Sequence, residues 1–412
     1  MKVSVLLIGY LEQYIKSIKE SFQDISISVI EESSLIPNNK IEGVKVFTGK
    51  YQQNNEALSV AIEINKTEKF NAVIPLREYA VPLCNDIATE LGLLKVGRLA
   101  SRCFRDKYLL RTTLSQMNLK YIKQPNFLRI ESIDDLYEFY NKQGLCIIKP
   151  SNKQATVGVF KIISKDQISE FYQKSVNADE PGRLASDRKL IWEYQAEQLI
   201  EGSEYSVEMF VKNGNIIFFN VTKKITDDGA VPFEIGHMLP VSIFDAHQSK
   251  AFRAVCEELV NVMEVENSVL HSEWMVSGNE IFLIECAARA PGGHITDLLN
   301  NSYEFQFFHQ YLNLMMGLEL SEFSSPSRIT AIRQFTPARG IVKEVIKDIS
   351  SLSRGVIDGI KILSYLNNME KGDYISVENN QSRAGHIIIE GTCDKLMNEK
   401  LTQISSTAII TE

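Results

Sequence analysis

The segment 271–299, HSEWMVSGNEIFLIECAARAPGGHITDLL, has the pattern of a strand, a tight turn, a second strand, a glycine-rich loop and a helix. Glu273 and Glu285 are separated by an even number of residues, so an odd-length loop around Ser277–Asn279 places both carboxylates on one face of the ribbon. Two carboxylates on adjacent strands lie within reach of one Mg²⁺ ion. The segment therefore predicts a metal site, with a surface ion-pair cluster as the alternative.

A cation and two glycines follow the second carboxylate of this ribbon. Arg289 comes four residues after Glu285, where a guanidinium can stabilise negative charge on a reacting carbonyl group. Gly292 and Gly293 then open the helix, and the N–H groups and dipole of a helix start favour an anion. These three residues are candidate catalytic groups. His294 comes next and either contacts a substrate or caps and packs the helix.

A second segment, Cys146–Val159 (CIIKPSNKQATVGV), predicts a strand, a polar loop and a further strand. The first strand delivers Lys149, and Pro150 ends it. A lysine at a strand end beside a flexible loop suits phosphate binding, because its charge adds to the N–H donors of the loop. The loop holds few glycines before Gly158, so an edge-strand lysine beside a hairpin is the alternative.

A third segment, Glu193–Glu208 (EYQAEQLIEGSEYSVE), predicts a strand, the short apolar linker Leu199–Ile200 and a return strand after Gly202. Glu204 stands just before that return strand. Such a linker can offer backbone groups to an adenine edge and a carboxylate to ribose hydroxyls. A solvated acidic hairpin fits the same residues.

The first hundred residues alternate between strand-like and helix-like patterns, which predicts an open parallel α/β sheet. The chain has 412 residues and a net charge of −8, with 44 Lys and Arg against 52 Asp and Glu. This balance argues against nucleic acid as a partner, because phosphate backbones need a basic face. Six cysteines without a C-x-x-C pair indicate buried thiols in a reducing cytoplasm. No apolar run approaches the ~20 residues that span a bilayer, so no membrane contact is expected.

The ordered set of motifs resembles the ATP-grasp superfamily: a lysine, a second lysine at a strand end, E-x-x-x-x-G-x-E, and E…E-x-x-x-R. It is most similar to the carboxylate–amine ligase branch, which includes bacterial L-amino acid ligases. The resemblance covers the whole chain and implies an α/β and α+β architecture. We expect an N-terminal open parallel α/β domain at 1–105, a two-subdomain ATP-grasp module at 106–320 (106–190 and 191–320), and a small C-terminal α+β domain at 321–412.

The resemblance also implies a role for each matching residue. The stretch FRDKYLLRTTL matches the D-K…R segment of the family, so Lys107 is implied as the first nucleotide-binding lysine and Lys149 as the second. The remaining matches are the adenine hinge at Glu197, Gln198, Leu199 and Ile200, the ribose-binding acid Glu204, the metal ligands Glu273 and Glu285, the arginine beside the acyl phosphate at Arg289, and a substrate-side loop with Glu234 and His237.

Two departures from the family pattern stand out. The usual E-x-N metal motif reads Glu285-Cys286-Ala287, so its asparagine ligand is missing. The phosphate loop lacks its usual glycines, and Ser151 and Thr156 are expected to supply donors in their place.

The sequence thus predicts an ATP-dependent carbon–nitrogen ligase that uses ATP and Mg²⁺, with Mn²⁺ as an alternative metal. It would join a small-molecule carboxylate to an amine, both amino-acid-like, through an acyl phosphate, and release ADP and phosphate. The alternatives are a biotin-carboxylase-like enzyme that activates bicarbonate and a non-catalytic ATP-binding regulator on the same fold. A dinucleotide-binding oxidoreductase is disfavoured, because no G-x-G-x-x-G follows Val3–Ile8. A homodimer is left open.

Overall fold

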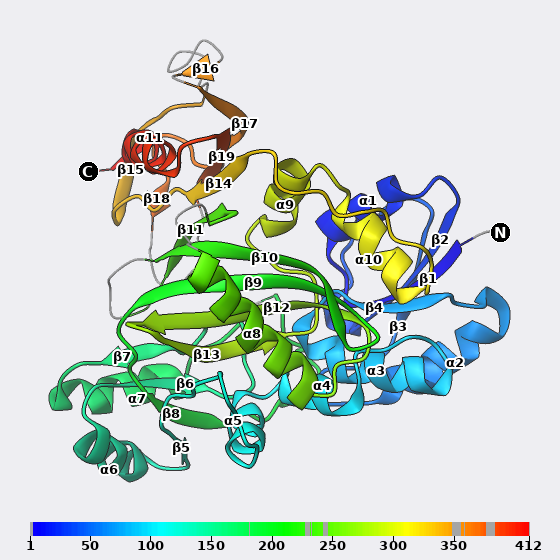
Figure 1. Ribbon diagram of the computed structural model, residues 1–412, viewed down its shortest axis with the longest axis horizontal. Coiled ribbons are helices and arrows are strands. Elements are labelled where there is room, and N and C mark those ends of the chain that lie inside the picture. Colours follow the sequence, from blue (N-terminus) through cyan, green and yellow to red (C-terminus); the bar gives the residue numbers. More distant parts are fainter. Residues whose placement is uncertain are drawn as a thin grey trace.

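The computed structural model describes residues 3–180, 182–226, 231, 233–241, 246–347, 356–357, 359–375 and 384–411. The described strands form four sheets (Figure 1). The N-terminal sheet lies at the right of the view, and the C-terminal strands lie at the upper left, where several of them extend a large central sheet (Figure 1).

The N-terminal sheet is parallel in the order β3-β2-β1-β4, which confirms the predicted α/β arrangement. Residues of β1 alternate between two cores: Val5 and Leu7 face α1 and α10, whereas Leu6 and Ile8 face α2 and α3. Both faces are therefore covered, as the apolar strand requires. The elements are β1 (Val3–Ile8), α1 (Glu12–Ser21), β2 (Ile25–Glu31), η1 (Ser33–Leu35), β3 (Val44–Thr48), α2 (Glu56–Glu68), β4 (Ala72–Pro75), η2 (Glu78–Ala80) and α3 (Val81–Glu90).

A small antiparallel sheet in the order β5-β8-β6-β7 carries the predicted phosphate loop. The helices α6 and α7 pack on it through a core that includes Leu136, Phe139 and Phe171. The elements of this part are α4 (Arg98–Cys103), α5 (Lys107–Ser115), β5 (Phe127–Ile130), α6 (Ile133–Gln143), β6 (Cys146–Pro150), β7 (Phe160–Ile162), η3 (Lys165–Gln167), α7 (Ile168–Val176) and β8 (Tyr194–Gln198).

A nine-stranded sheet in the order β13-β12-β9-β10-β11-β14-β19-β17-β16 forms the centre of the molecule. The helix α8 lies across it (Figure 1) and packs Phe252, Val255 and Leu259 against the strands. The elements are β9 (Ser203–Lys212), β10 (Asn215–Thr226), β11 (Glu234–Leu239), α8 (Ala246–Val262), β12 (Ser268–Ser277), β13 (Glu280–Ala287), α9 (Ile295–Tyr303), α10 (Phe307–Met315), β14 (Ile329–Gln334), β16 (Val356–Ile357), β17 (Ile360–Asn367) and β19 (Gly385–Gly391).

The C-terminal strands extend this central sheet, because β11 pairs with β14. A three-stranded sheet in the order β18-β15-β20 and the helix α11 complete this end of the chain. Its elements are β15 (Gly340–Val345), β18 (Tyr374–Ile375), α11 (Asp394–Thr407) and β20 (Ile409–Thr411). The α+β character of the tail is as expected, and the division at residue 321 stays a prediction.

The β12–β13 hairpin corrects one detail of the sequence prediction. Ser277 pairs with Glu280, so the loop has two residues and not an odd number. A β-bulge at Ile284 shifts the register between Glu273 and Trp274, and Glu273 therefore lies directly opposite Glu285. The two carboxylates share a face because of the bulge, whereas the loop length alone would have separated them.

Gly202 allows β9 to approach β12 closely. A Cβ atom at this position would lie 2.0 Å from the carbonyl oxygen of Val276. We therefore expect Gly202→Ala to destabilise the fold by about 1–3 kcal/mol through overpacking, seen as a lower thermal midpoint.

Gly278→Ala is the matched control, because a Cβ there meets no atom within 4 Å and only the positive φ of 58° opposes it. That substitution should cost about 1 kcal/mol. A Gly202→Ala protein as stable as the Gly278→Ala protein would contradict the close approach.

Candidate active site

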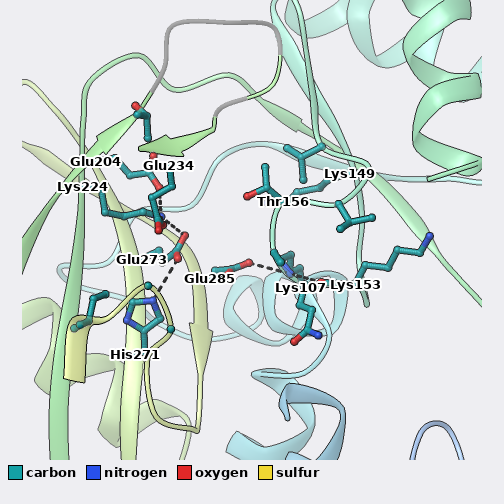
Figure 2. A pocket seen from close by; sticks show the side chains of 18 of the residues that line it. Lys107, Lys149, Lys153, Thr156, Glu204, Lys224, Glu234, His271, Glu273 and Glu285 are labelled. Carbon is teal, nitrogen blue, oxygen red and sulfur yellow. Dashed lines mark hydrogen bonds and ion pairs between the residues drawn. The ribbon is translucent and has the colours of Figure 1, made fainter. Parts of the chain in front are cut away.

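A cavity of about 420 Å³ lies between the phosphate loop and the central sheet. Figure 2 shows lysines from the loop side facing carboxylates on the strands of the central sheet. Eleven of the predicted site residues line it: Lys107, Lys149, Thr156, Glu204, Glu234, His237, Glu273, Glu285, Arg289, Gly292 and Gly293. Segments far apart in the sequence thus converge on a single polar site.

Lys107 bridges the loop side and Glu285, one of the two predicted metal ligands. It is the first residue of α5, whose N-cap Asp106 accepts a hydrogen bond from Leu109 N. Its Nζ lies 2.9 Å from Glu285 Oε2 and 3.0 Å from the carbonyl oxygen of Lys153. Burial alone would lower the pKa of Lys107, but Glu285 and a second carboxylate raise it above the usual lysine value. The ammonium therefore stays charged between the two halves of the cavity.

Lys149 is paired with the first residue of the predicted adenine hinge. Its Nζ lies 2.6 Å from Glu197 Oε2, and Arg111 Nε lies 3.0 Å from Glu197 Oε1. All three side chains are buried. Burial would raise the pKa of Glu197, but Arg111 and Lys149 lower it, so the carboxylate is ionised. The pair fixes Lys149 at the end of β6, from where its ammonium lines the cavity.

The rest of the predicted nucleotide segment lies behind or beside the cavity. The N–H groups of Gln198 and Leu199 already donate to the carbonyl oxygens of Asn126 and Leu145. Ser151 is buried and its hydroxyl donates to Gln195 Oε1. The cavity is not lined by Ser151, Gly158, Glu197, Gln198, Leu199, Ile200 or His294.

The phosphate loop reaches its shape without the family's glycines. Ala155 and Thr156 both adopt positive φ, 57° and 61°, and Gly158 follows at 75°. Non-glycine residues in this left-handed region cost about 1 kcal/mol each. The loop is held by Lys153 Nζ, which donates to the carbonyl oxygen of Ala178. Thr156 lines the cavity, as a donor to phosphate would have to.

Lys224 is the centre of the acidic side, and the sequence analysis missed it. Its buried Nζ lies 2.5 Å from Glu204 Oε1, 2.8 Å from Glu273 Oε2 and 3.5 Å from Glu234 Oε2 (Figure 2). Burial would lower the pKa of Lys224, but the three carboxylates raise it well above its usual value. Lys223 and Lys224 are adjacent on β10, and strand alternation alone does not say which of them faces inward.

His271 was also missed and connects the buried Glu208 to Glu273, a predicted metal ligand. Its Nδ1 lies 3.0 Å from Glu208 Oε1, and its Nε2 lies 3.4 Å from Glu273 Oε1. Burial would lower the pKa of His271, but hydrogen bonds to both carboxylates raise it to about 9. The imidazole is therefore a cation near neutral pH, and both of its nitrogens donate.

The predicted substrate-side residues Glu234 and His237 lie beside Gly293. His237 Nε2 lies 2.7 Å from Glu234 Oε1. A Cβ at Gly293 would lie 2.7 Å from His237 Nε2, and the residue has φ of 63°, so both space and conformation require glycine. Arg289 is fixed by an N-terminal residue, because its Nη2 lies 2.8 Å from Glu78 Oε2.

The helix after the glycines starts later than predicted. α9 begins at Ile295, with His294 as its N-cap in a left-handed conformation, so Gly292 and Gly293 precede the helix. His294 Nδ1 lies 2.8 Å from Asp297 Oδ2, and its ring lies 4.4 Å from that of His386. These contacts give His294 a local structural role beside the cavity.

The residues fit a magnesium ion that arrives with a nucleotide. Among the described residues, no group of three or more His, Cys, Asp or Glu side chains is arranged to hold a metal alone. Mg²⁺ is usually bound by one or two carboxylates together with substrate phosphates, and Glu273 and Glu285 supply that number. Ala287, in place of the family's asparagine, is buried and offers no side-chain ligand.

Comparison with known proteins agrees with this geometry. Residues 143–297 match the ATP-grasp domain family. No curated protein matches the sequence. The structure is similar to L-amino acid ligase from Bacillus licheniformis, with 16% identity, a TM-score of 0.80 and coverage of 100% of this chain and 98% of that chain. Phosphoribosylglycinamide synthetase from Anaerococcus prevotii gives 15% identity, a TM-score of 0.67 and full coverage of both chains. Biotin carboxylase from Campylobacter jejuni gives 10% identity, a TM-score of 0.64 and coverage of 99% and 92%.

The fold places a polar cavity between a small antiparallel sheet and a larger one. Residues 143–297 match the ATP-grasp domain family, and the chain shares its fold over its whole length with L-amino acid ligase. The predicted resemblance to ATP-grasp proteins and the predicted fold are thereby confirmed. The matches also agree with the predicted ATP-dependent ligase. At these identities the likeness to each solved structure shows the fold alone. The described helices include none long and apolar enough to cross a membrane.

The charged state of His271 makes the metal-free protein sensitive to pH. Its pKa is about 9 in the folded protein against 6.5 unfolded, so its stabilising effect is complete below about pH 6.5 and is lost as pH rises towards 9. The effect is at most about 3 kcal/mol. In EDTA, the thermal midpoint of the wild type should fall across this window, and His271→Gln should remove most of that fall.

His309→Gln is the control. The ring of His309 stacks on Phe22, whereas His271 is paired with carboxylates of the site. An unchanged pH profile in His271→Gln would show that the imidazole is neutral.

Proposed function

We propose that this protein is an ATP-dependent carboxylate–amine ligase that forms an amide or peptide bond through an acyl phosphate. The observation that most directly supports this proposal is the pairing of Glu273 with Glu285 in a cavity that is also lined by Lys107, Lys149 and Arg289. This set supplies metal ligands, phosphate-binding cations and a cation for a reacting carbonyl group. Phosphoryl transfer needs little more than such positioning and charge neutralisation.

In the proposed reaction, the phosphates of ATP lie between the loop side and the ribbon. Lys107 and Lys149 bind phosphate oxygens, Thr156 donates from the loop, and Glu204 accepts from the ribose hydroxyls. Glu273 and Glu285 would hold Mg²⁺, or Mn²⁺, whose chemistry is to neutralise the phosphate charge. The segment Ser151–Val157 closes over the site and excludes water, because water would hydrolyse an acyl phosphate.

The substrate carboxylate and the amine react at the end of the cavity formed by Arg289, Gly292 and Gly293. The substrate carboxylate attacks the γ-phosphorus, and ADP leaves. The amine then attacks the acyl carbonyl, phosphate leaves, and the amine loses a proton. Arg289 and the N–H groups of Gly292 and Gly293 stabilise the negative charge on the carbonyl oxygen. Glu234 and His237 face this part of the cavity and suit a substrate with polar groups. His294 is held beside it by Asp297.

ADP release over a panel of amino acid pairs tests the function. We expect release that needs both an acid and an amine, and its loss in Glu285→Gln while the thermal midpoint is retained. Glu280→Gln, on the same strand at the exposed turn, is the matched control. Release with bicarbonate alone would favour a carboxylase, and nucleotide binding without release would favour a regulator. A cytoplasmic location and a homodimer are further predictions.

Arg289 should act on the reaction more than on ATP binding. Its guanidinium is oriented by Glu78, and the pair raises the pKa of Arg289 against the lowering effect of burial. Arg289→Lys should lower kcat by about 10²–10³ with every active pair, because an ammonium lacks the planar fork of donors. Calorimetry should show unchanged ATP affinity.

Arg328→Lys is the control, since Arg328 pairs with Glu304 and Glu390 at the surface. If Arg289→Lys keeps its kcat and loses ATP affinity, the residue binds nucleotide and the direction of the substrate in the cavity is reversed.

A further inference from the structure

Both oxygens of the metal carboxylate Glu273 are occupied by cations of the protein itself. His271 Nε2 lies 3.4 Å from Oε1, and Lys224 Nζ lies 2.8 Å from Oε2. A divalent cation needs a lone pair of at least one of these oxygens, and it is repelled by a charge so close. Binding of a metal to Glu273 is therefore opposed by these charges unless one of the two cations withdraws.

His271 is held in place and is not free to withdraw. Its partner Glu208 is fully buried and also accepts hydrogen bonds from Ser206 Oγ at 2.8 Å, Asn220 Nδ2 at 2.8 Å and Thr222 Oγ1 at 2.6 Å. Tyr303 OH of α9 in turn donates to Asn220 Oδ1 at 2.9 Å. Displacing the imidazole would leave a buried carboxylate without its cation, which is strongly unfavourable.

Lys224 can withdraw without losing all of its partners. Its ammonium is carried on a flexible four-carbon stem. When it leaves Glu273, Glu204 at 2.5 Å and Glu234 at 3.5 Å remain as partners. These carboxylates come from β9 and β11, on either side of the strand that carries Lys224, so a short movement away from β12 keeps the charge paired.

We propose that Lys224 is an internal cation that occupies Glu273 until a nucleotide-bound divalent metal displaces it, so that the metal enters with the nucleotide and not before it. The proposal rests on the assignment of Glu273 as a metal carboxylate in the proposed function. The nucleotide contributes the additional negative charge and phosphate oxygens that make the exchange favourable. Without the nucleotide, the metal must compete for the two carboxylates against an ammonium that is already in contact.

Binding of Mn²⁺, followed by the electron paramagnetic resonance signal of the free ion, tests this exchange. We expect the wild type to bind Mn²⁺ weakly alone and much more tightly with ADP. Lys224→Met removes the charge at similar length, so nucleotide-free binding of Mn²⁺ should become about tenfold tighter or more. The enhancement by ADP should shrink accordingly. Loss of a lysine with a purely structural role would not tighten metal binding.

Lys223→Met is the matched control, because Lys223 is the exposed neighbour on the same strand. It should leave both affinities unchanged. Lys224→Gln, whose amide still donates to a carboxylate, is the second variant should methionine prevent folding, and it should shift the nucleotide-free affinity in the same direction.

The outcomes separate this proposal from the proposed function. Nucleotide-free affinity that is unchanged or weaker in the folded Lys224 variants overturns the exchange, even if the ligase activity is found. Tighter binding in those variants supports the exchange, even if no acid–amine pair reacts. If Mn²⁺ binds neither the wild type with ADP nor any variant, Glu273 is not a metal carboxylate and the exchange is wrong.

Discussion

The pairing of Glu273 with Glu285 across the β12–β13 ribbon puts two negative charges side by side in one cavity. Like charges so close are tolerated only if cations surround them. Lys107 forms an ion pair with Glu285, whereas Lys224 and His271 form ion pairs with Glu273. The same ribbon leads directly into Arg289, whose guanidinium pairs with Glu78 of the short helix η2. Charge balance around this pair thus explains why four separate parts of the chain converge there.

Much of this could be predicted from motifs, because the motif residues carry their chemistry with them. The parallel N-terminal sheet follows from apolar strands that are buried on both faces, and the lysine at the end of β6 follows from a strand stopped by Pro150. The shared face of Glu273 and Glu285 was predicted for the wrong reason, since the bulge at Ile284 and not the loop length produces it. A bulge leaves little trace in one sequence, because it depends on the pairing partner.

What the sequence could not show are the residues whose role depends on long-range partners. Lys224 looks like its neighbour Lys223, and only the order β12-β9-β10-β11 brings three carboxylates around it. His271 stands two residues before Glu273, which suggests the same face, but its partner Glu208 is 63 residues away. The register of β9 against β12 decides that contact, and no local pattern encodes it.

The N-terminal part of the chain contacts the site through a strap formed by residues 178–180 and 182–192. Arg188 binds both oxygens of Glu32, with distances of 2.6 and 2.9 Å, and Tyr79 OH lies 2.6 Å from Glu180. At its start the strap accepts a hydrogen bond from Lys153 of the phosphate loop. The loop that holds the phosphate side is therefore tied to the domain that holds Arg289 through Glu78. Because both sets of contacts run to the N-terminal part of the chain, the cations at the two ends of the cavity are positioned relative to each other, as the proposed transfer from nucleotide to acceptor would require.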